Sequence, residues 1–220
     1  MASTEEDTEL IFLLLIKILS NGGELTSDES TSVVDKSYLS FTAGSGVVKL
    51  CRLPRYERRL SPEQFQLLAT IVQSSESTVR ASFAKKLHKG LNSFQLPIRF
   101  MSLFSLAATD SDKANIGHAR NYLANCIKLR QTYMKTNETI SNKPTLQAQF
   151  MPEYSVPYLV HLLAHHEDID EDRQNKYENT YRCLSFYLGE LYTANNYSFL
   201  MNLLFGIRRT KDAVTPDSNV

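Results

Sequence analysis

The sequence predicts an all-α fold in which antiparallel helix pairs stack side by side. Apolar residues recur at three- and four-residue spacing through most of the 220 residues, and strand-like alternation is nearly absent. Only 8 Gly and 7 Pro interrupt the chain, so its composition is compatible with long helices. Short links between such helices favour antiparallel neighbours. Taken in pairs, the helices form units of about 40 residues, so the expected fold class is a HEAT-repeat α-solenoid of antiparallel helix pairs.

The first predicted helix spans residues 8–20 and leads into a polar loop over 24–35. Its side chains are apolar nearly all round, which is typical of a helix packed between others. The apolar run is too short to cross a bilayer, Lys17 interrupts it, and acidic residues precede it where an export signal needs positive charge. Gly22 and Gly23 are suited to the left-handed end of this helix. No membrane partner is expected.

The later helices are predicted from the same periodicity and from their start and stop signals. Ser61, Pro62 and Glu63 form a helix start, with serine as the N-cap, proline at the first helical position and an acid in the first turn. Ser77 is the expected N-cap of the helix after that. The predicted helices span residues 36–53, 62–73, 77–89, 95–108, 112–135, 146–165, 177–192 and 197–208.

Residues 36–208 are predicted to form the HEAT-like repeats, after an N-terminal helix and polar loop over 1–35. Residues 209–220 are polar and lack periodicity, so a disordered tail is expected there. The segment 77–87 has the Val-Arg, Ala and Leu pattern of many second helices of HEAT units. The arginine at this position, Arg80, commonly reaches a carbonyl or carboxylate in the adjacent repeat. Neighbouring repeats are expected to bury one another's apolar faces.

The cysteine and histidine residues do not indicate a metal site. Cys51, Cys126 and Cys183 are far apart and include no CxxC pair, so they are interpreted as small core residues in a reducing compartment. His161 and His165 have the spacing of a zinc-protease helix. However, the residue after the first histidine is a leucine, where that chemistry needs a glutamate as general base. A packing role at a helix end is the preferred interpretation.

Motifs for other cofactors or for catalysis are also missing. The acidic cluster over 167–172 lacks the glycine of an EF-hand loop and is interpreted as a solvated link between helices. Gly44-Ser45-Gly46 has neither the third glycine of a dinucleotide fingerprint nor the Gly-Lys-Ser/Thr of a phosphate loop. No Gly-x-Ser-x-Gly elbow is present. The sequence therefore predicts a protein that is not an enzyme, with no cofactor, no metal and no small-molecule substrate.

Charge is distributed unevenly, although the formal net charge is +0. Residues 1–35 contain eight acidic residues and one lysine, and residues 36–136 contain sixteen basic and five acidic residues. Residues 137–220 contain seven basic and eleven acidic residues. A basic middle with acidic ends indicates an anionic partner, either an acidic protein segment or a phosphate backbone.

The candidate partner-binding site is a basic ridge of Arg80, Lys85, Lys86, Lys89 and Arg99. Lys85 and Lys89 lie four residues apart on one face of a predicted helix, with Lys86 beside them. Together with Arg99 they would line one edge of the solenoid and bind an acidic segment, or a DNA backbone by counterion release. A merely solvated surface is the alternative. A second basic set precedes the ridge and consists of Arg52, Arg55, Arg58 and Arg59.

Four blocks carry a more specific resemblance. In chain order they are Thr42–Ser45, Phe83–Leu91, Pro152–His165 and Thr210–Asp217. Together they resemble the C-terminal repeats of the precocious-dissociation-of-sisters (Pds) family of sister chromatid cohesion regulators, from about residue 36 to the end. Another nuclear HEAT-repeat adaptor, or a chromatin- or DNA-binding array, is the alternative.

The resemblance implies a nuclear, chromatin-associated solenoid that binds other proteins. Members of the family bind the kleisin subunit of cohesin and meet cohesin regulators, namely the Wapl-type releasing factor, sororin and the cohesin acetyltransferase. Through these contacts they maintain and release sister chromatid cohesion. The expected function is that of a non-catalytic scaffold and regulator of cohesion, with weak contact to DNA as a further expectation.

Overall fold

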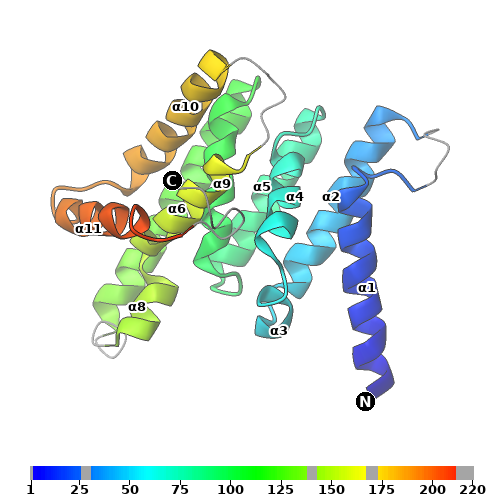
Figure 1. The fold of residues 1–220 in the computed structure, drawn as a ribbon, viewed down its shortest axis with the longest axis horizontal. Coiled ribbons are helices and arrows are strands. Elements are labelled where there is room, and N and C mark those ends of the chain that lie inside the picture. The colour runs from blue at the N-terminus through cyan, green and yellow to red at the C-terminus, as the bar shows by residue number, and fades with distance from the viewer. Residues whose placement is uncertain (1, 26–30, 138–142, 167–172, 212–220) are drawn as a thin grey trace.

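The computed structural model describes residues 2–25, 31–137, 143–166 and 173–211, and every regular element within them is helical (Figure 1). The predicted all-α fold is confirmed. None of the described helices combines the length and apolar character that a membrane span requires. In chain order the elements are α1 (Ala2–Ser20), α2 (Val33–Leu50), α3 (Pro54–Glu57), α4 (Pro62–Val72), α5 (Ser77–Asn92), the 3₁₀ helix η1 (Ile98–Thr109), α6 (Lys113–Thr136), α8 (Pro144–Phe150), the 3₁₀ helix η2 (Pro152–Ser155), α9 (Val156–Ala164), α10 (Arg173–Leu191) and α11 (Tyr197–Ile207).

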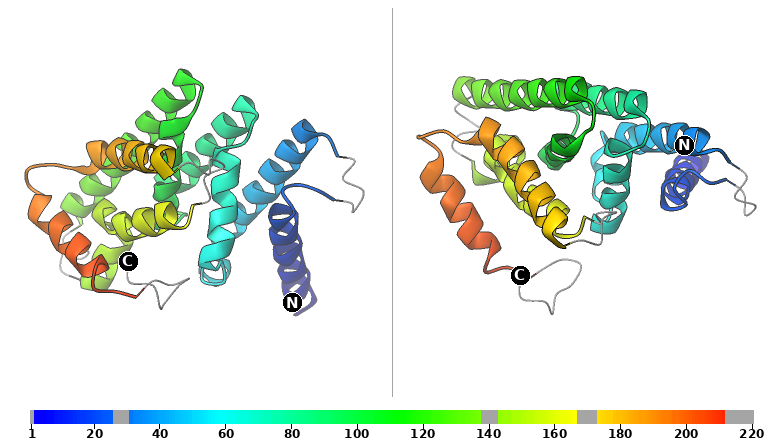
Figure 2. Two further views of the ribbon diagram at one scale, coloured as in Figure 1. Left: turned by 45° about the horizontal axis from the view of Figure 1, so that its top comes forward. Right: turned by 90° about the horizontal axis from the view of Figure 1, so that it is seen from above.

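The long helices are arranged in two layers. Along one side of the molecule lie α2, α5 and α6, and on the other side lie α4, α9 and α10 (Figure 2, right). α1 contacts α2 and α4 at the N-terminal edge of the stack. Gly44 of α2 is buried against Ile71 of α4, and its missing side chain lets these two helices approach closely. Each helix buries its apolar stripe mainly against its neighbours, as a repeat array requires.

The centre of the stack is η1, in which residues 98 and 100–107 are all buried. It contacts α4, α6, α9 and α10. The sequence correctly predicts helix here, but it predicts an α-helix over 95–108 and the segment is a 3₁₀ helix. Ser102 donates a hydrogen bond to the carbonyl of Arg99, and Ser105 donates one to the carbonyl of Ser102, each at 2.7 Å. These three-residue steps satisfy buried hydroxyls within the tighter helix.

The single helix predicted over 146–165 is broken in the structure into α8, η2 and α9. Met151 is extended, with φ −67° and ψ 123°, and separates α8 from η2. Pro152 explains the break, because the residue before a proline is driven out of the helical region. The break turns the chain between α8 and α9, and α8 lies beside the C-terminal end of α6, where Phe150 packs 5.3 Å from Tyr133 (Figure 1).

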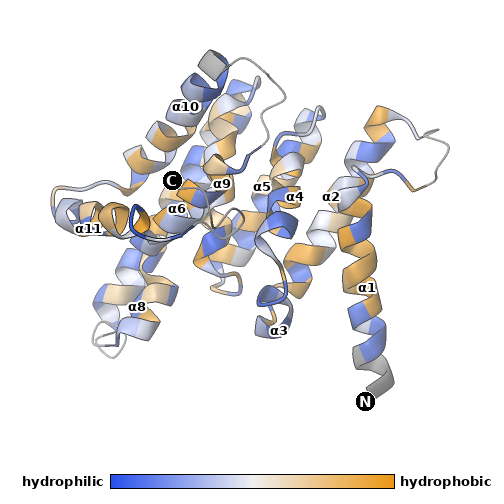
Figure 3. Cartoon of the chain, viewed as in Figure 1, coloured by the Kyte–Doolittle hydropathy of each residue, from blue (hydrophilic) through white to orange (hydrophobic). Residues whose placement is uncertain are grey.

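α1 is covered on one side only, so the prediction that it is enclosed by other helices is wrong among the described residues. Phe12, Ile16 and Leu19 are buried, and the ring of Phe12 lies 5.4 Å from that of Tyr56. Figure 3 shows apolar colouring along the middle of α1. The large apolar side chains on its outer side are exposed, namely Leu10, Ile11, Leu13 and Leu14.

Most predicted helix ends agree with the structure. Ser61 accepts a hydrogen bond from the Gln64 backbone at 3.2 Å while Gln64 accepts one from the Ser61 backbone at 3.1 Å, which completes a capping box. Gly22 and Gly23 end α1 with φ of +59° and +84°. The prediction for Ser77 is wrong: α5 begins at this residue, and its hydroxyl instead donates to Asp112 at the start of α6.

Replacing Phe104 of η1 with alanine is expected to destabilise the fold strongly. Phe104 is 1% exposed, whereas Phe205 of α11 is 52% exposed. Phe104→Ala should lower the free energy of unfolding by about 3–5 kcal/mol, because it opens a cavity in the central core. Phe205→Ala, which removes the same atoms from an exposed site, is the matched control and should cost far less. Urea unfolding followed by circular dichroism measures both, and similar losses would contradict a core centred on η1.

Candidate partner-binding surface and pocket

Arg80 lies between two repeats and contributes little to the surface. Its guanidinium forms two 2.8 Å contacts with the Asp110 carboxylate, and the two side chains are 10% and 3% exposed. It also donates to the carbonyls of Ser74 and Ser75 at 2.7 and 3.0 Å. Arg80 therefore ties the turn before α5 to the start of α6, as the repeat pattern predicts. It is not a free cation of the basic ridge.

The Asp110 carboxylate is held in its charged form by these hydrogen bonds. Burial, the largest influence, favours the neutral carboxyl. The hydrogen bonds from Arg80 and from the backbone N–H of Asp112 outweigh it and keep the pKa of Asp110 below its ordinary value of 3.8. The ion pair is consequently present at neutral pH and is a structural link between repeats.

Arg99 is placed beside α3 and packed between aromatic rings. Its Nε lies 3.0 Å from the Glu57 carboxylate, and its Nη atoms donate to the carbonyls of Glu57 and Leu60. The guanidinium also lies 5.3 Å from the ring centroid of Phe65 and 5.6 Å from that of Phe100. These contacts fix Arg99 in place and leave little of its charge at the outer surface.

Lys85, Lys86 and Lys89 are the members of the ridge that are exposed, and all three project from α5. The ammonium of Lys86 lies 5.5 Å from the ring centroid of Phe41 in α2, which is a cation–π contact. The lysines thus lie where α5 meets α2. The structure therefore brings together three of the five predicted residues.

The three lysines belong to a larger cationic face formed by the layer of α2, α5 and α6. These helices contain eleven basic residues, and Asp35 is their one acidic residue. Acids from other elements pair with Arg80, Arg120 and Lys36. The exposed cations outside these pairs favour anionic partners. The exposed lysines of the cationic face are Lys49, Lys85, Lys86, Lys89, Lys113, Lys128 and Lys135.

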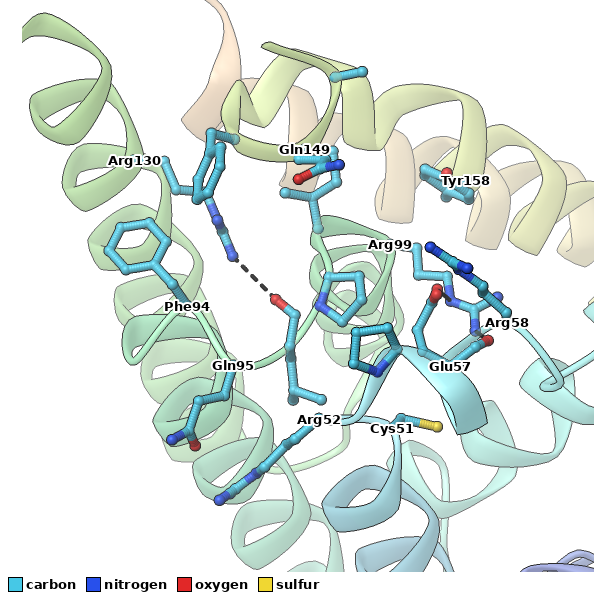
Figure 4. A pocket seen from close by; sticks show the side chains of 16 residues that line it. Cys51, Arg52, Glu57, Arg58, Phe94, Gln95, Arg99, Arg130, Gln149 and Tyr158 are labelled. Carbon is cyan, nitrogen blue, oxygen red and sulfur yellow. Dashed lines mark hydrogen bonds and ion pairs between the residues drawn. The ribbon is translucent and has the colours of Figure 1, made fainter. Parts of the chain in front are cut away.

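A pocket of about 430 Å³ lies beside this layer, where α3, α6, α8 and the link before η1 meet. Arg130 and Phe94 lie on one side of it and Arg99, Arg58 and Glu57 on the other (Figure 4). Segments far apart in the sequence therefore build one site. The arginine pocket is defined by four basic side chains, and its walls also contain aromatic residues: Arg52, Arg58, Arg99 and Arg130, with Phe94, Phe150 and Tyr158.

Arg130 is the most unusual residue of the pocket, because it is charged yet only 2% exposed. It donates to the carbonyls of Leu91 and Leu96 at 3.4 Å, and its guanidinium lies 5.1 Å from the ring centroid of Phe94. Burial lowers the pKa of Arg130. Within the described residues it has no carboxylate partner, and its Nε has no hydrogen-bond acceptor. A buried cation without a counter-ion is costly to maintain.

Phe94 is held in a strained conformation at the rim of the same pocket. Its φ of 55° is in the left-handed region, which a large aromatic residue rarely adopts. The ring packs 4.8 Å from that of Tyr133 and 5.9 Å from that of Phe150, which holds it in place. Such strain is found preferentially at binding and catalytic sites.

The pocket was not predicted from the sequence, although one signal for it is visible there. Ala119, Leu123, Ile127 and Arg130 follow one another at three- and four-residue spacing on the buried face of α6. An arginine in such an apolar stripe predicts a buried charge that needs a partner. The aromatic residues that complete the walls come from other helices and give no local signal.

The histidine pair with zinc-protease spacing lies at the end of α9. Within the described residues, no group of three or more His, Cys, Asp or Glu side chains is arranged to hold an ion. His161 and His165 lie on α9 and at its end, with their ring centroids 4.7 Å apart. The acidic cluster over 167–172 lies outside the described residues, as does most of the predicted disordered tail.

The three cysteines are buried and form no disulfide among the described residues, as expected of core residues. Burial raises the pKa of Cys51 to about 12. Burial likewise raises the pKa of Cys126 to about 12. The reactive thiolate is therefore scarce at both positions near neutral pH. These side chains fill space between the helices.

Replacing Arg80 with methionine is expected to lower the free energy of unfolding by about 3–5 kcal/mol, because the buried Asp110 loses its cation. The matched control is Arg182→Met on α10. Arg182 pairs with Glu178 at 2.8 Å, but the two side chains are 57% and 58% exposed, so the loss there should stay below about 1 kcal/mol. Urea unfolding compares the two variants, and equal losses would show that the Arg80 pair is no stronger than a surface pair.

The Asp110 carboxylate should also make the stability of the fold depend on pH in the acidic range. Its folded pKa lies below the ordinary value of 3.8, so its contribution is present above that pH and is lost as pH falls through the folded pKa. The stability difference between the wild type and Asp110→Asn should therefore be largest near pH 7 and shrink below about pH 4. Thermal unfolding across this range measures it. A difference that stays constant would contradict the assignment.

Comparisons with known proteins identify the family. The family model described as sister chromatid cohesion protein PDS5 matches residues 1–220, so the match includes α1 and does not begin near residue 36 as the resemblance suggests. The chain is 39% identical over 213 residues to sister chromatid cohesion protein PDS5 homolog A-B of Xenopus laevis, which covers 93% of this chain and 16% of that protein. It is 37% identical over 210 residues to the Homo sapiens homolog A, and this match covers 94% of this chain and 16% of that protein. It is 37% identical over 208 residues to the Homo sapiens homolog B, and this match covers 93% of this chain and 14% of that protein. The chain thus spans about one sixth of these relatives, and it belongs to the PDS5 family of sister chromatid cohesion proteins.

Proposed function

We propose that this chain acts as a non-catalytic helical scaffold in the regulation of sister chromatid cohesion. It binds cohesin through the kleisin subunit and contacts cohesin regulators, and it works in the nucleus on chromatin. Membership of the PDS5 family supports the process. The all-helical repeat architecture supports a role in which surfaces, rather than bond-making groups, carry the function.

The observation that carries the proposal is the cationic face of α2, α5 and α6. Lys85, Lys86 and Lys89 are exposed on the middle helix of that layer, and no acidic residue occurs on α5 or α6. Exposed lysines on helices that contain no acidic residue attract an acidic segment of another chain over long range and speed its association. In this proposal the lysines contact the kleisin. Arg80 of the predicted ridge fixes α5, which presents them, and Arg99 fixes α3 against η1.

The same face is compatible with weak contact to a DNA backbone, since exposed lysines neutralise phosphates without reading sequence. DNA binding is therefore the second candidate. The two candidates differ in their dependence on salt and in their competition with kleisin.

Reversing the charge of the three lysines is the direct test. The variant Lys85→Glu/Lys86→Glu/Lys89→Glu should weaken binding of purified kleisin at least about tenfold, because attraction to acidic groups becomes repulsion. The matched control is Lys17→Glu/Lys143→Glu/Lys176→Glu, which makes the same change at exposed lysines of α1, of the residue before α8 and of α10. Isothermal titration calorimetry measures both, and circular dichroism checks their folding.

Three results decide the outcome. Loss of kleisin binding in the α5 variant, with binding retained in the control, supports the proposal. Undiminished binding in the α5 variant contradicts the assigned surface. Binding to duplex DNA that falls steeply with added salt, in the absence of any kleisin binding, would instead favour the DNA candidate.

A further inference from the structure

We propose that the arginine pocket binds a short acidic peptide segment of a partner protein. Its arginines, Arg52, Arg58, Arg99 and Arg130, come from the end of α2, from the residues around α3, from η1 and from α6. This site is separate from the α5 lysines. The arginines would bind carboxylates of the peptide, and the aromatic walls would contact an apolar side chain between those carboxylates. The inference therefore does not depend on the proposed function.

The pocket has an excess of positive charge that the described residues do not neutralise. Its four arginines face one acidic residue, Glu57, which is already paired with Arg99. Arg52, Arg58 and Arg130 form no ion pair with any residue in the described part of the chain. Three cations without counter-ions around one cavity create a site for an anion.

The Nε–H of Arg130 is a buried hydrogen-bond donor in the pocket that has no acceptor among the described residues. Its Nε is buried without a hydrogen-bond partner, and so is the Nε of Arg52 on another wall. Arginine is not deprotonated in proteins, so neither group can escape this cost by losing a proton. A carboxylate in the pocket would accept hydrogen bonds from a guanidinium in bidentate geometry and offset the cost of burial.

The remaining walls favour a peptide over a compact polyanion. Phe150 and Tyr158 contribute aromatic surface, and the exposed fraction of Tyr158 is 45%. A polyphosphate has no apolar group to place against such rings, whereas an apolar peptide side chain does. The volume of about 430 Å³ is in the range of ligand sites and holds a few side chains. The strained backbone of Phe94 at the rim is consistent with a preformed site.

The absence of tryptophan from the chain makes the test simple. Because the protein has 0 Trp, the fluorescence of a single tryptophan in a probe peptide reports binding without background. The probe is acetyl-Glu-Asp-Trp-Glu-Asp-amide, and its neutral counterpart is acetyl-Gln-Asn-Trp-Gln-Asn-amide. We expect the acidic probe to bind at least about tenfold more tightly at low ionic strength, where attraction between charges is least screened. Equal affinity for the two probes would overturn the proposal.

A pair of substitutions locates the binding. Arg52→Gln/Arg58→Gln should weaken the acidic probe at least about tenfold, because two of the three uncompensated cations are lost. These positions are preferred to Arg130, whose burial in the helix layer would couple its loss to folding. The matched control is Arg208→Gln/Arg209→Gln, which removes two exposed arginines at the end of α11. If both pairs weakened binding of the acidic probe equally, the effect would come from net charge alone, and the assignment of the probe to the arginine pocket would be overturned.

Two further measurements separate a peptide site from a small-anion site. Tyr158→Ala should weaken the acidic probe several-fold, since it removes part of the apolar wall. Inorganic pyrophosphate at the same concentration as the probe should displace it only partly. Complete displacement by pyrophosphate together with no effect of Tyr158→Ala would show that the pocket takes a small anion and would overturn the peptide proposal.

Discussion

The structure depends on one buried segment, residues 98–107 of η1, around which the other helices are packed. Nearly every side chain in it is buried, so it has no solvated face and must be covered on all sides. α4, α6, α9 and α10 supply that cover, although they come from opposite halves of the chain. The Arg80–Asp110 pair then fixes the start of α6 relative to α5. These contacts hold the helix pairs together as one unit. The layer of α2, α5 and α6 on its outside exposes the lysines.

Much of the fold is predictable from local sequence because local physics decides it. The capping box at Ser61, the glycines after α1 and the apolar stripe of α6 each act within a few residues, and the corresponding helices form as expected. Two features could not be predicted in this way. The nearly continuous apolar run of η1 does not distinguish a 3₁₀ helix from an α-helix. The outer face of α1 is exposed because of where that helix lies in the stack, which periodicity does not reveal.

The candidate site likewise contains some residues that local sequence predicts and others that it does not. The lysines of α5 could be found from sequence, since residues four apart on a helix share a face. The partners of Arg80 and Arg99 could be found only in part, because a basic residue looks the same in a sequence whether it meets solvent or a buried acid. Of the arginine pocket, only Arg130 gives a local signal, since the walls span residues 51 to 158 and meet only after the repeats have stacked.

The buried thiols have a consequence for how opening of this array can be observed. Cys51 follows α2, Cys126 lies on α6 and Cys183 lies on α10, so each marks a different part of the stack. A maleimide or disulfide reagent reaches such a thiol only when the surrounding helices separate. The chain therefore contains three native reporters of local opening. The order in which these thiols are labelled would reveal whether the repeats separate together or from one end.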